Sequence, residues 1–134
     1  MIAVDTSVVV AGFASWHEGH RSALKALARG PRVPAHVLLE TYSVLTRLPP
    51  PHRSPATIVA AFLMERFSEA PLTLTPRAHG RLISRAAEVD ILGGSLYDAL
   101  VGATVAEARG TLLTRDRRAA ATYEKIGVEF ELLD

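Results

Sequence analysis

The sequence has no cysteine among its 134 residues. This absence excludes disulfide bonds, thiolate metal sites and cysteine nucleophiles. The apolar runs are all far shorter than the roughly 18 residues that suggest a membrane span. Residues 1–5 also lack the basic segment with which a secretory signal begins. We therefore expect a cytoplasmic protein that has no association with a membrane.

Several catalytic motifs are missing as well. There is no Gly-x-x-x-x-Gly-Lys phosphate-binding loop, no Gly-x-Gly-x-x-Gly and no Gly-x-Ser-x-Gly. His17 and His20 are three residues apart, but no cysteine or His-Glu-x-x-His pattern accompanies them, so they indicate surface or packing histidines and not a zinc site. Asp5 is not followed two residues later by a second aspartate, which argues against a phospho-aspartate phosphatase.

The composition is that of an ordinary globular protein, with 49% hydrophobic and 22% charged residues. A chain of this length buries roughly two-thirds of its unfolded surface, so we expect residues 1–134 to form a single domain. The formal net charge of +1 is small, but the arginines are unevenly spread. One set recurs at helical spacing, the pattern of a solvated helix face, and a second set surrounds an aspartate. These sets are Arg77, Arg81 and Arg85, and Arg115, Arg117 and Arg118 around Asp116.

Short apolar segments alternate with longer segments of helical periodicity. The segments that predict strands are residues 2–4, 32–35, 72–74, 111–114 and 128–132. The segments that predict helices are residues 6–11, 17–29, 36–48, 56–67, 76–89, 95–108 and 117–126, with the first expected to end or bend at Gly12. This alternation predicts a three-layer α/β/α sandwich, in which helices cover both faces of a mostly parallel central sheet.

Four acidic side chains are expected at one edge of this sheet. Asp5 and Asp116 each come directly after a strand, and the carboxyl ends of parallel strands lie at the same edge. Because right-handed crossovers begin their helices at that edge, Asp98 in the first turn of its helix belongs there too. Glu40 falls in the first half of the helix that follows residues 32–35. Topology alone therefore brings together four acids that are far apart in the sequence.

Each aspartate also has a purely structural interpretation. Asp5 is in position to cap the helix that follows it. Residues 95–98 fit a capping box, in which a carboxylate near the helix N-terminus gains about 0.3–1 kcal/mol from the helix dipole. Asp116 is flanked by Arg115 and Arg117, and an ion pair with either is a third alternative.

Glu40 is harder to explain as a structural residue. It shares a helix face with Val37 and Val44, and no lysine or arginine lies three or four positions away. A buried carboxylate without a partner is costly, and four clustered carboxylates repel one another unless a cation compensates them. The cations that all-oxygen sites prefer are Mg²⁺ and Mn²⁺.

Carboxylate-bound metal ions suit the hydrolysis of phosphodiester bonds. The metal activates water and stabilises the attacking and leaving oxygens, with two ions about 4 Å apart in the two-metal form. Arg115, Arg117 and Arg118 would then bind backbone phosphates near the site. The four acids therefore predict a metal-dependent nuclease.

The chain resembles the PIN-domain nucleases, and within them the VapC toxins of bacterial toxin–antitoxin pairs. The resemblance covers essentially the whole chain and is carried by four stretches in the order of the family: Val4-Asp5-Thr6-Ser7, Leu39-Glu40, Tyr97-Asp98-Ala99 and Leu113-Thr114-Arg115-Asp116. It implies that Asp5, Glu40, Asp98 and Asp116 form an acidic metal site, with Thr6 and Thr114 as supporting hydroxyls.

The resemblance also implies partners and an activity. These are Mg²⁺- or Mn²⁺-dependent cleavage of RNA, a homodimer, and inhibition by a small VapB-type antitoxin. Two alternatives remain open: a PIN-family RNA-processing nuclease without an antitoxin, and a non-catalytic binding module that keeps the acids for structure.

Overall fold

The centre of the fold is a sheet of three parallel strands, and the computed structural model describes the whole chain, residues 1–134. The strands β1 (Ile2–Val4), β2 (Thr111–Thr114) and β3 (Glu129–Leu132) lie in the order β1-β2-β3. In the register of the sheet Val4 is paired with Leu113, and Leu113 with Glu131. The central strand β2 is almost entirely buried, whereas the edge strand β3 alternates exposed and half-buried residues. The predicted parallel sheet is therefore confirmed.

Two of the five expected strands are wrong. Residues 32–35 and 72–74 each contribute only single bridges, which pair Ala3 with Arg32 and Pro34 with Leu72. Both bridges are parallel, and in the first the Arg32 amide donates to the Ile2 carbonyl at 2.9 Å. Proline has no amide hydrogen, so a ladder cannot continue through Pro34.

The seven expected helices are all present. They are α1 (Thr6–Phe13), α2 (His20–Ala28), α3 (Ala35–Arg47), α4 (Ala56–Arg66), α5 (Pro76–Glu88), α6 (Ser95–Glu107) and α7 (Arg117–Ile126). Helix α2 begins three residues later than expected because residues 14–20 form consecutive turns, in which the His17 amide donates to Ala14 and the His20 amide to His17. None of the helices combines the length and the hydropathy that a membrane span needs.

Gly12 does not end α1, which was one of the two alternatives expected of it, and it allows α2 to approach this helix. The helix continues to Phe13, and a Cβ atom at Gly12 would lie 2.4 Å from the Cδ1 atom of Leu27. A larger residue here would displace the buried Leu27 side chain of α2.

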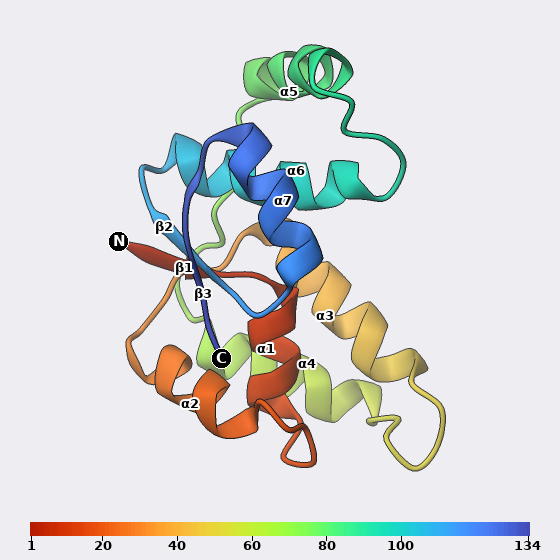
Figure 1. The fold of residues 1–134 in the computed structure, drawn as a ribbon. Helices are drawn as coiled ribbons and strands as arrows, with labels where there is room; N and C mark the ends of the chain where they lie inside the picture. Colours follow the sequence, from red (N-terminus) through yellow and green to blue (C-terminus); the bar gives the residue numbers. More distant parts are fainter.

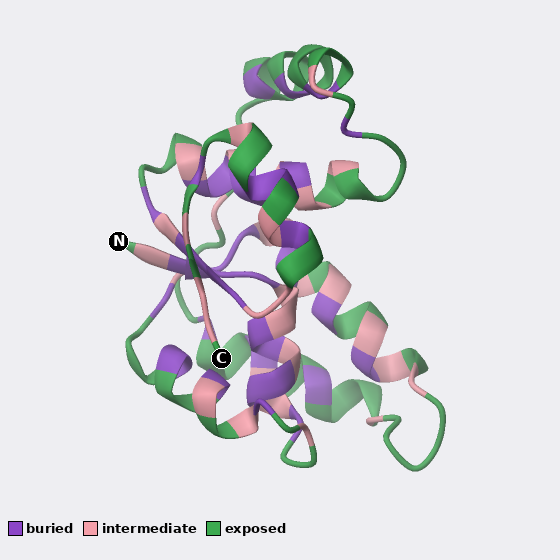
Figure 2. Cartoon of the chain, viewed as in Figure 1, coloured by how far each residue is buried: buried purple, intermediate pink, exposed green.

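The helices lie on both sides of the sheet, as Figure 1 shows. Helices α1 to α4 gather on one side, and α6 and α7 cover the other. A single core of 21 buried residues joins these layers, including Val4, Val9, Leu45, Leu112 and Tyr123. Figure 2 shows this buried region around the strands and on the inner faces of the helices. The three-layer α/β arrangement is thus confirmed.

Helix α5 lies at the outer end of the molecule, packed against α6 (Figure 1). Its apolar stripe belongs to a second, smaller cluster of six buried residues: Leu74, Ala78, Leu82, Ala86, Ile91 and Ala99. The exposed side of α5 carries Arg77, Arg81 and Arg85, of which Arg81 contacts Glu107 of α6 and Arg85 contacts Glu88. The arginines at helical spacing therefore form the expected solvated face.

Candidate active site

Asp5 stands at the junction between β1 and α1. It is the N-cap of α1, and its Oδ1 atom accepts hydrogen bonds from the Ser7 amide at 3.0 Å and the Ser7 hydroxyl at 2.5 Å. Its Oδ2 atom accepts a hydrogen bond from the Tyr123 hydroxyl at 2.8 Å. The side chain is only 4% exposed, and this burial raises the pKa of the carboxyl above its usual range. The capping role expected for Asp5 is confirmed, and it coexists with a position in the acidic pocket.

Asp116 plays the same part for α7. Its Oδ1 atom accepts hydrogen bonds from the amides of Arg118 at 2.9 Å and Ala119 at 3.3 Å, so it is the N-cap of that helix. None of the four ion pairs in the protein involves Asp116. The alternative in which Arg115 or Arg117 forms an ion pair with Asp116 is therefore wrong. Backbone amides of α7 donate hydrogen bonds to this carboxylate instead.

Asp98 has no such local partner. Gly94 is the N-cap of α6 and no side chain caps the helix, so the capping box expected at residues 95–98 is wrong. Ser95 is already inside the first turn, where its hydroxyl cannot take the N-cap position. Burial, followed by the negative charges of Asp116, Glu40 and Asp5, raises the pKa of Asp98 to about 6.

Glu40 enters the site from the second turn of α3, on the opposite side of the pocket. It is half-buried, and its Oε1 atom accepts a hydrogen bond from the hydroxyl of Thr6, the first residue of α1. The predicted supporting role of Thr6 therefore has a structural counterpart. Thr114 is buried beneath the site, where its hydroxyl oxygen accepts from the Asp116 amide at 3.0 Å.

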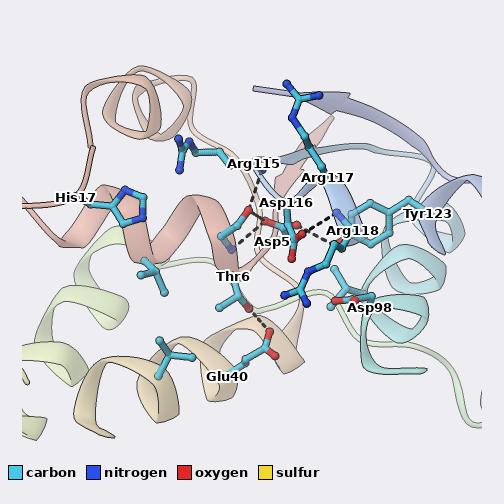
Figure 3. A pocket seen from close by; sticks show the side chains of 14 residues that line it. Asp5, Thr6, His17, Glu40, Asp98, Arg115, Asp116, Arg117, Arg118 and Tyr123 are labelled. Atoms are coloured by element: carbon cyan, nitrogen blue, oxygen red, sulfur yellow. Dashed lines mark hydrogen bonds between the residues drawn. The ribbon is translucent and has the colours of Figure 1, made fainter. Parts of the chain in front are cut away.

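The four acids face one pocket of about 490 Å³. Figure 3 shows their side chains entering it from the ends of β1 and β2 and from α3 and α6. Other residues that line the pocket are Thr6, Ser7, His17, Arg115, Arg117, Arg118 and Tyr123. The structure thus brings together every site residue expected from the sequence except Thr114, which supports the pocket from below.

The donor set of this pocket suits a hard divalent cation. Its acids offer only oxygen atoms, the ligands that Mg²⁺ and Mn²⁺ prefer. The negative charges of Asp116, Glu40 and Asp5 raise the pKa of Asp98, so the carboxylates repel one another. A bound cation would relieve this repulsion. No three of the histidine and acidic side chains stand close enough together to form a ready ligand cluster. The four acids therefore fit a metal ion by the chemistry of their oxygen donors and by lining one pocket, although they are not close enough to coordinate it as they stand.

The arginines of the pocket differ in their positions. Arg118 lies near enough to Asp98 for its charge to lower that pKa, whereas the guanidinium of Arg117 points away from the acids (Figure 3). Arg115 donates from Nε to the Asp134 carbonyl at 3.0 Å and lies flat against Gly19. A Cβ atom at position 19 would lie 2.1 Å from the Arg115 Cζ atom, so only glycine leaves room for this guanidinium.

Three pocket residues were missed by sequence reasoning. His17, expected at the surface or in packing, lines the pocket, and its Nδ1 atom accepts from the Gly19 amide at 2.9 Å. Burial and the charge of Arg115 lower the pKa of His17. Ser7 connects the first turn of α1 to the segment after β2, because its hydroxyl oxygen also accepts from the Arg115 amide at 2.8 Å. Tyr123 follows the helical apolar pattern of α7, and nothing near it in the sequence indicates a polar contact.

Comparison with known proteins shows what the chain is similar to. The model of the PIN domain family matches residues 2–125. The chain is 54% identical over 133 residues to Ribonuclease VapC40 of Mycobacterium tuberculosis, covering 99% of each protein.

Solved structures show the same fold. The chain superposes with a TM-score of 0.70 on VapC20 of Mycobacterium tuberculosis, a toxin that cleaves the sarcin–ricin loop, at 23% identity over 90% of this chain and 94% of that one. It superposes with a TM-score of 0.67 on a chain of the VapBC2 complex of Rickettsia felis bound to promoter DNA, at 16% identity over all of both chains. At these identities the likeness concerns the fold alone.

Proposed function

Because the chain belongs to the PIN-domain family, and within it to the VapC ribonucleases, we propose that the acidic pocket is the active site of an endoribonuclease toxin. Nucleases of this family hydrolyse phosphodiester bonds of RNA, and dependence on a divalent metal is typical of them. The observation that carries the assignment is the convergence of four acids from four elements on one pocket. Helix capping accounts for Asp5 and Asp116, but it does not account for Asp98 or Glu40.

Asp5, Asp98, Glu40 and Asp116 are the residues that would hold the metal, which we propose to be Mg²⁺ or Mn²⁺. When bound, the ion would activate water and stabilise negative charge at the phosphorus. Asp5 and Asp116 are held in place by backbone amides, and Thr6 orients Glu40. These hydrogen bonds orient three of the four carboxylates, and binding of a cation would draw the acids closer together.

The chain also supplies groups that bind the RNA. We assign Arg118 to a phosphate next to the scissile bond, because it borders Asp98. Arg115 and Arg117 line the same pocket and would bind phosphates farther along the strand. Guanidinium groups bind phosphate oxygens in pairs and remain charged at all physiological pH values.

The activity is tested with purified protein and total RNA, with and without Mg²⁺. We expect cleavage in Mg²⁺, none in a chelator, and a loss of at least about 100-fold in Asp5→Asn, since metal-ligand and charge-stabilising groups contribute effects of that size. Asp90→Asn is the matched control, because Asp90 is exposed, remote from the pocket and in a backbone conformation that asparagine tolerates. Full activity of Asp5→Asn would contradict the assignment.

We further propose a VapB-type antitoxin, a homodimer and action in the cytoplasm. The solved VapBC2 complex of Rickettsia felis supports the first, since it contains a protein of this fold. A short reading frame directly upstream, whose product copurifies with the chain and suppresses RNA cleavage, would favour the toxin over an RNA-processing nuclease. Light scattering of the purified chain measures the dimer directly.

A non-catalytic binding module is the remaining alternative. If the acids serve only for structure, the chain has no affinity for divalent cations. If they form a metal site, millimolar Mg²⁺ raises the melting temperature, because a ligand of the native state stabilises it. A thermal-shift titration with Mg²⁺ separates the two, with Asp98→Asn as the variant that must lose the shift.

A further inference from the structure

Tyr123 is a buried side chain that the acidic site does not yet account for. It lies on α7, is only 1% exposed, and belongs to the main core, where its ring centroid is 5.9 Å from that of Phe130. Its hydroxyl nevertheless reaches the pocket and donates to the Oδ2 atom of Asp5 at 2.8 Å. A core position is served equally well by phenylalanine, so the hydroxyl needs an explanation of its own.

The hydrogen bonds of Asp5 are unevenly distributed over its two oxygens. A carboxylate has about four lone-pair positions, two on each oxygen. On Oδ1 both are taken, by the amide and the hydroxyl of Ser7. On Oδ2 one is taken, by Tyr123. One lone pair of Oδ2 is therefore left for a further partner.

We propose that Tyr123 is a positioning residue, which fixes the Asp5 carboxylate so that a single oxygen, Oδ2, is offered to a divalent cation. The proposal rests on the function proposed above, in which Asp5 is a metal ligand. Without Tyr123 the carboxylate keeps its hydrogen bonds from Ser7 on Oδ1 but loses the one on Oδ2, so it turns more easily about the bond to its Cβ atom. The Tyr123 bond spans from α7 to the end of β1 and removes this freedom.

The choice of a phenol is chemically reasonable. A neutral hydroxyl orients the carboxylate and leaves its negative charge in place. A lysine or arginine at the same position would form an ion pair with Asp5 and repel a divalent cation, because like charges a few ångströms apart interact strongly in a buried site. Partners of metal ligands commonly act in this way, and their removal weakens metal binding or activity about 10- to 100-fold.

The test compares Tyr123→Phe with the unchanged protein, and calorimetric titration with Mg²⁺ alone is the main readout. Phenylalanine keeps the ring and its packing, so the melting temperature of the metal-free protein should change little. We expect the dissociation constant for Mg²⁺ to rise about 10-fold, and kcat for RNA cleavage at limiting Mg²⁺ to fall with KM for RNA unchanged. Tyr42→Phe, which removes a half-exposed hydroxyl from α3, is the control and should leave all values unchanged.

The outcomes distinguish the positioning role from the function on which it rests. An unchanged dissociation constant in Tyr123→Phe, in a protein that binds Mg²⁺ and loses binding in Asp5→Asn, overturns the role of Tyr123 alone. An equal loss of melting temperature with and without Mg²⁺ also overturns it, because that result describes a purely structural tyrosine. If the unchanged protein binds no Mg²⁺ and cleaves no RNA, the proposed function fails and the positioning role fails with it.

Discussion

The chemistry of Asp98 depends strongly on its neighbours. Burial and three other carboxylates hold its pKa at about 6, above the ordinary value of 3.8. The folded state therefore binds a proton more tightly than the unfolded state does. By linkage, the resulting stability is fully present below about pH 4 and is lost as the pH rises through about 6. At neutral pH the metal-free protein is thus destabilised by its own site.

This linkage predicts that Asp98→Asn stabilises the metal-free protein. Asparagine resembles the protonated acid, so the difference in melting temperature between the variant and the unchanged protein should be absent near pH 4, grow up to about pH 6 and stay constant above it. Thermal melts in a chelator at several pH values measure this. A difference that does not change with pH, or one equal to that of Asp90→Asn, would show that the pKa of Asp98 is not raised in the folded protein.

Whether a site residue could be predicted from the sequence depends on how far apart in the sequence its contacts lie. Asp5 and Asp116 follow strands whose ends must meet, so topology alone brought them together. Tyr123 could not be foreseen, because its partner Asp5 is 118 positions away and its own helix shows only a core pattern. His17 lay in a turn that the periodicity assigned to a helix.

At the scale of elements, two helices begin on residues of the active site. The N-cap of α1 is Asp5 and that of α7 is Asp116, so the same carboxylates that converge on the pocket also satisfy free amides of these helices. A substitution at either position therefore changes two properties, and the choice of the new residue can separate them.

Two substitutions of Asp116 make this separation measurable. Asparagine is also a good N-cap, so Asp116→Asn should keep the stability within a few tenths of a kcal/mol while RNA cleavage falls. Asp116→Ala should lose cleavage and also about 1 kcal/mol of unfolding free energy, the usual cost of an N-cap. Urea unfolding and a cleavage assay on both variants test this. Cleavage that survives in Asp116→Asn would leave only the capping role.

The elements themselves were foreseen where local patterns dominate. Helical periodicity identified all seven helices, but the apolar segments 32–35 and 72–74 resembled strands and form only single bridges. Proline decides this difference, because Pro34 interrupts the ladder that the neighbouring residues would continue. The capping box at residues 95–98 failed for a related reason: its sequence pattern is satisfied, yet the helix begins one residue earlier, after Gly94.

For the whole molecule, the charge is nearly balanced while the pocket holds both acids and arginines. Binding of RNA should therefore depend on a small number of arginine side chains. In the inactive Asp5→Asn background, Arg118→Ala should weaken RNA binding and reduce the slope of log affinity against log salt by about 0.7, the value for one contact to single-stranded nucleic acid. Fluorescence anisotropy at several salt concentrations measures the slope. Arg77→Ala on α5 is the control, and an equal effect there would indicate diffuse binding.

The small core beneath α5 has a consequence for motion. Six buried residues hold this helix, whereas 21 form the main core, so α5 should open at a lower free energy than the sheet and exchange its amide hydrogens sooner. Ala99, which belongs to the same small cluster, is the residue after Asp98. Opening of α5 should therefore loosen the start of α6. Asp98, which lies in that first turn, should be the most mobile of the four acids of the pocket.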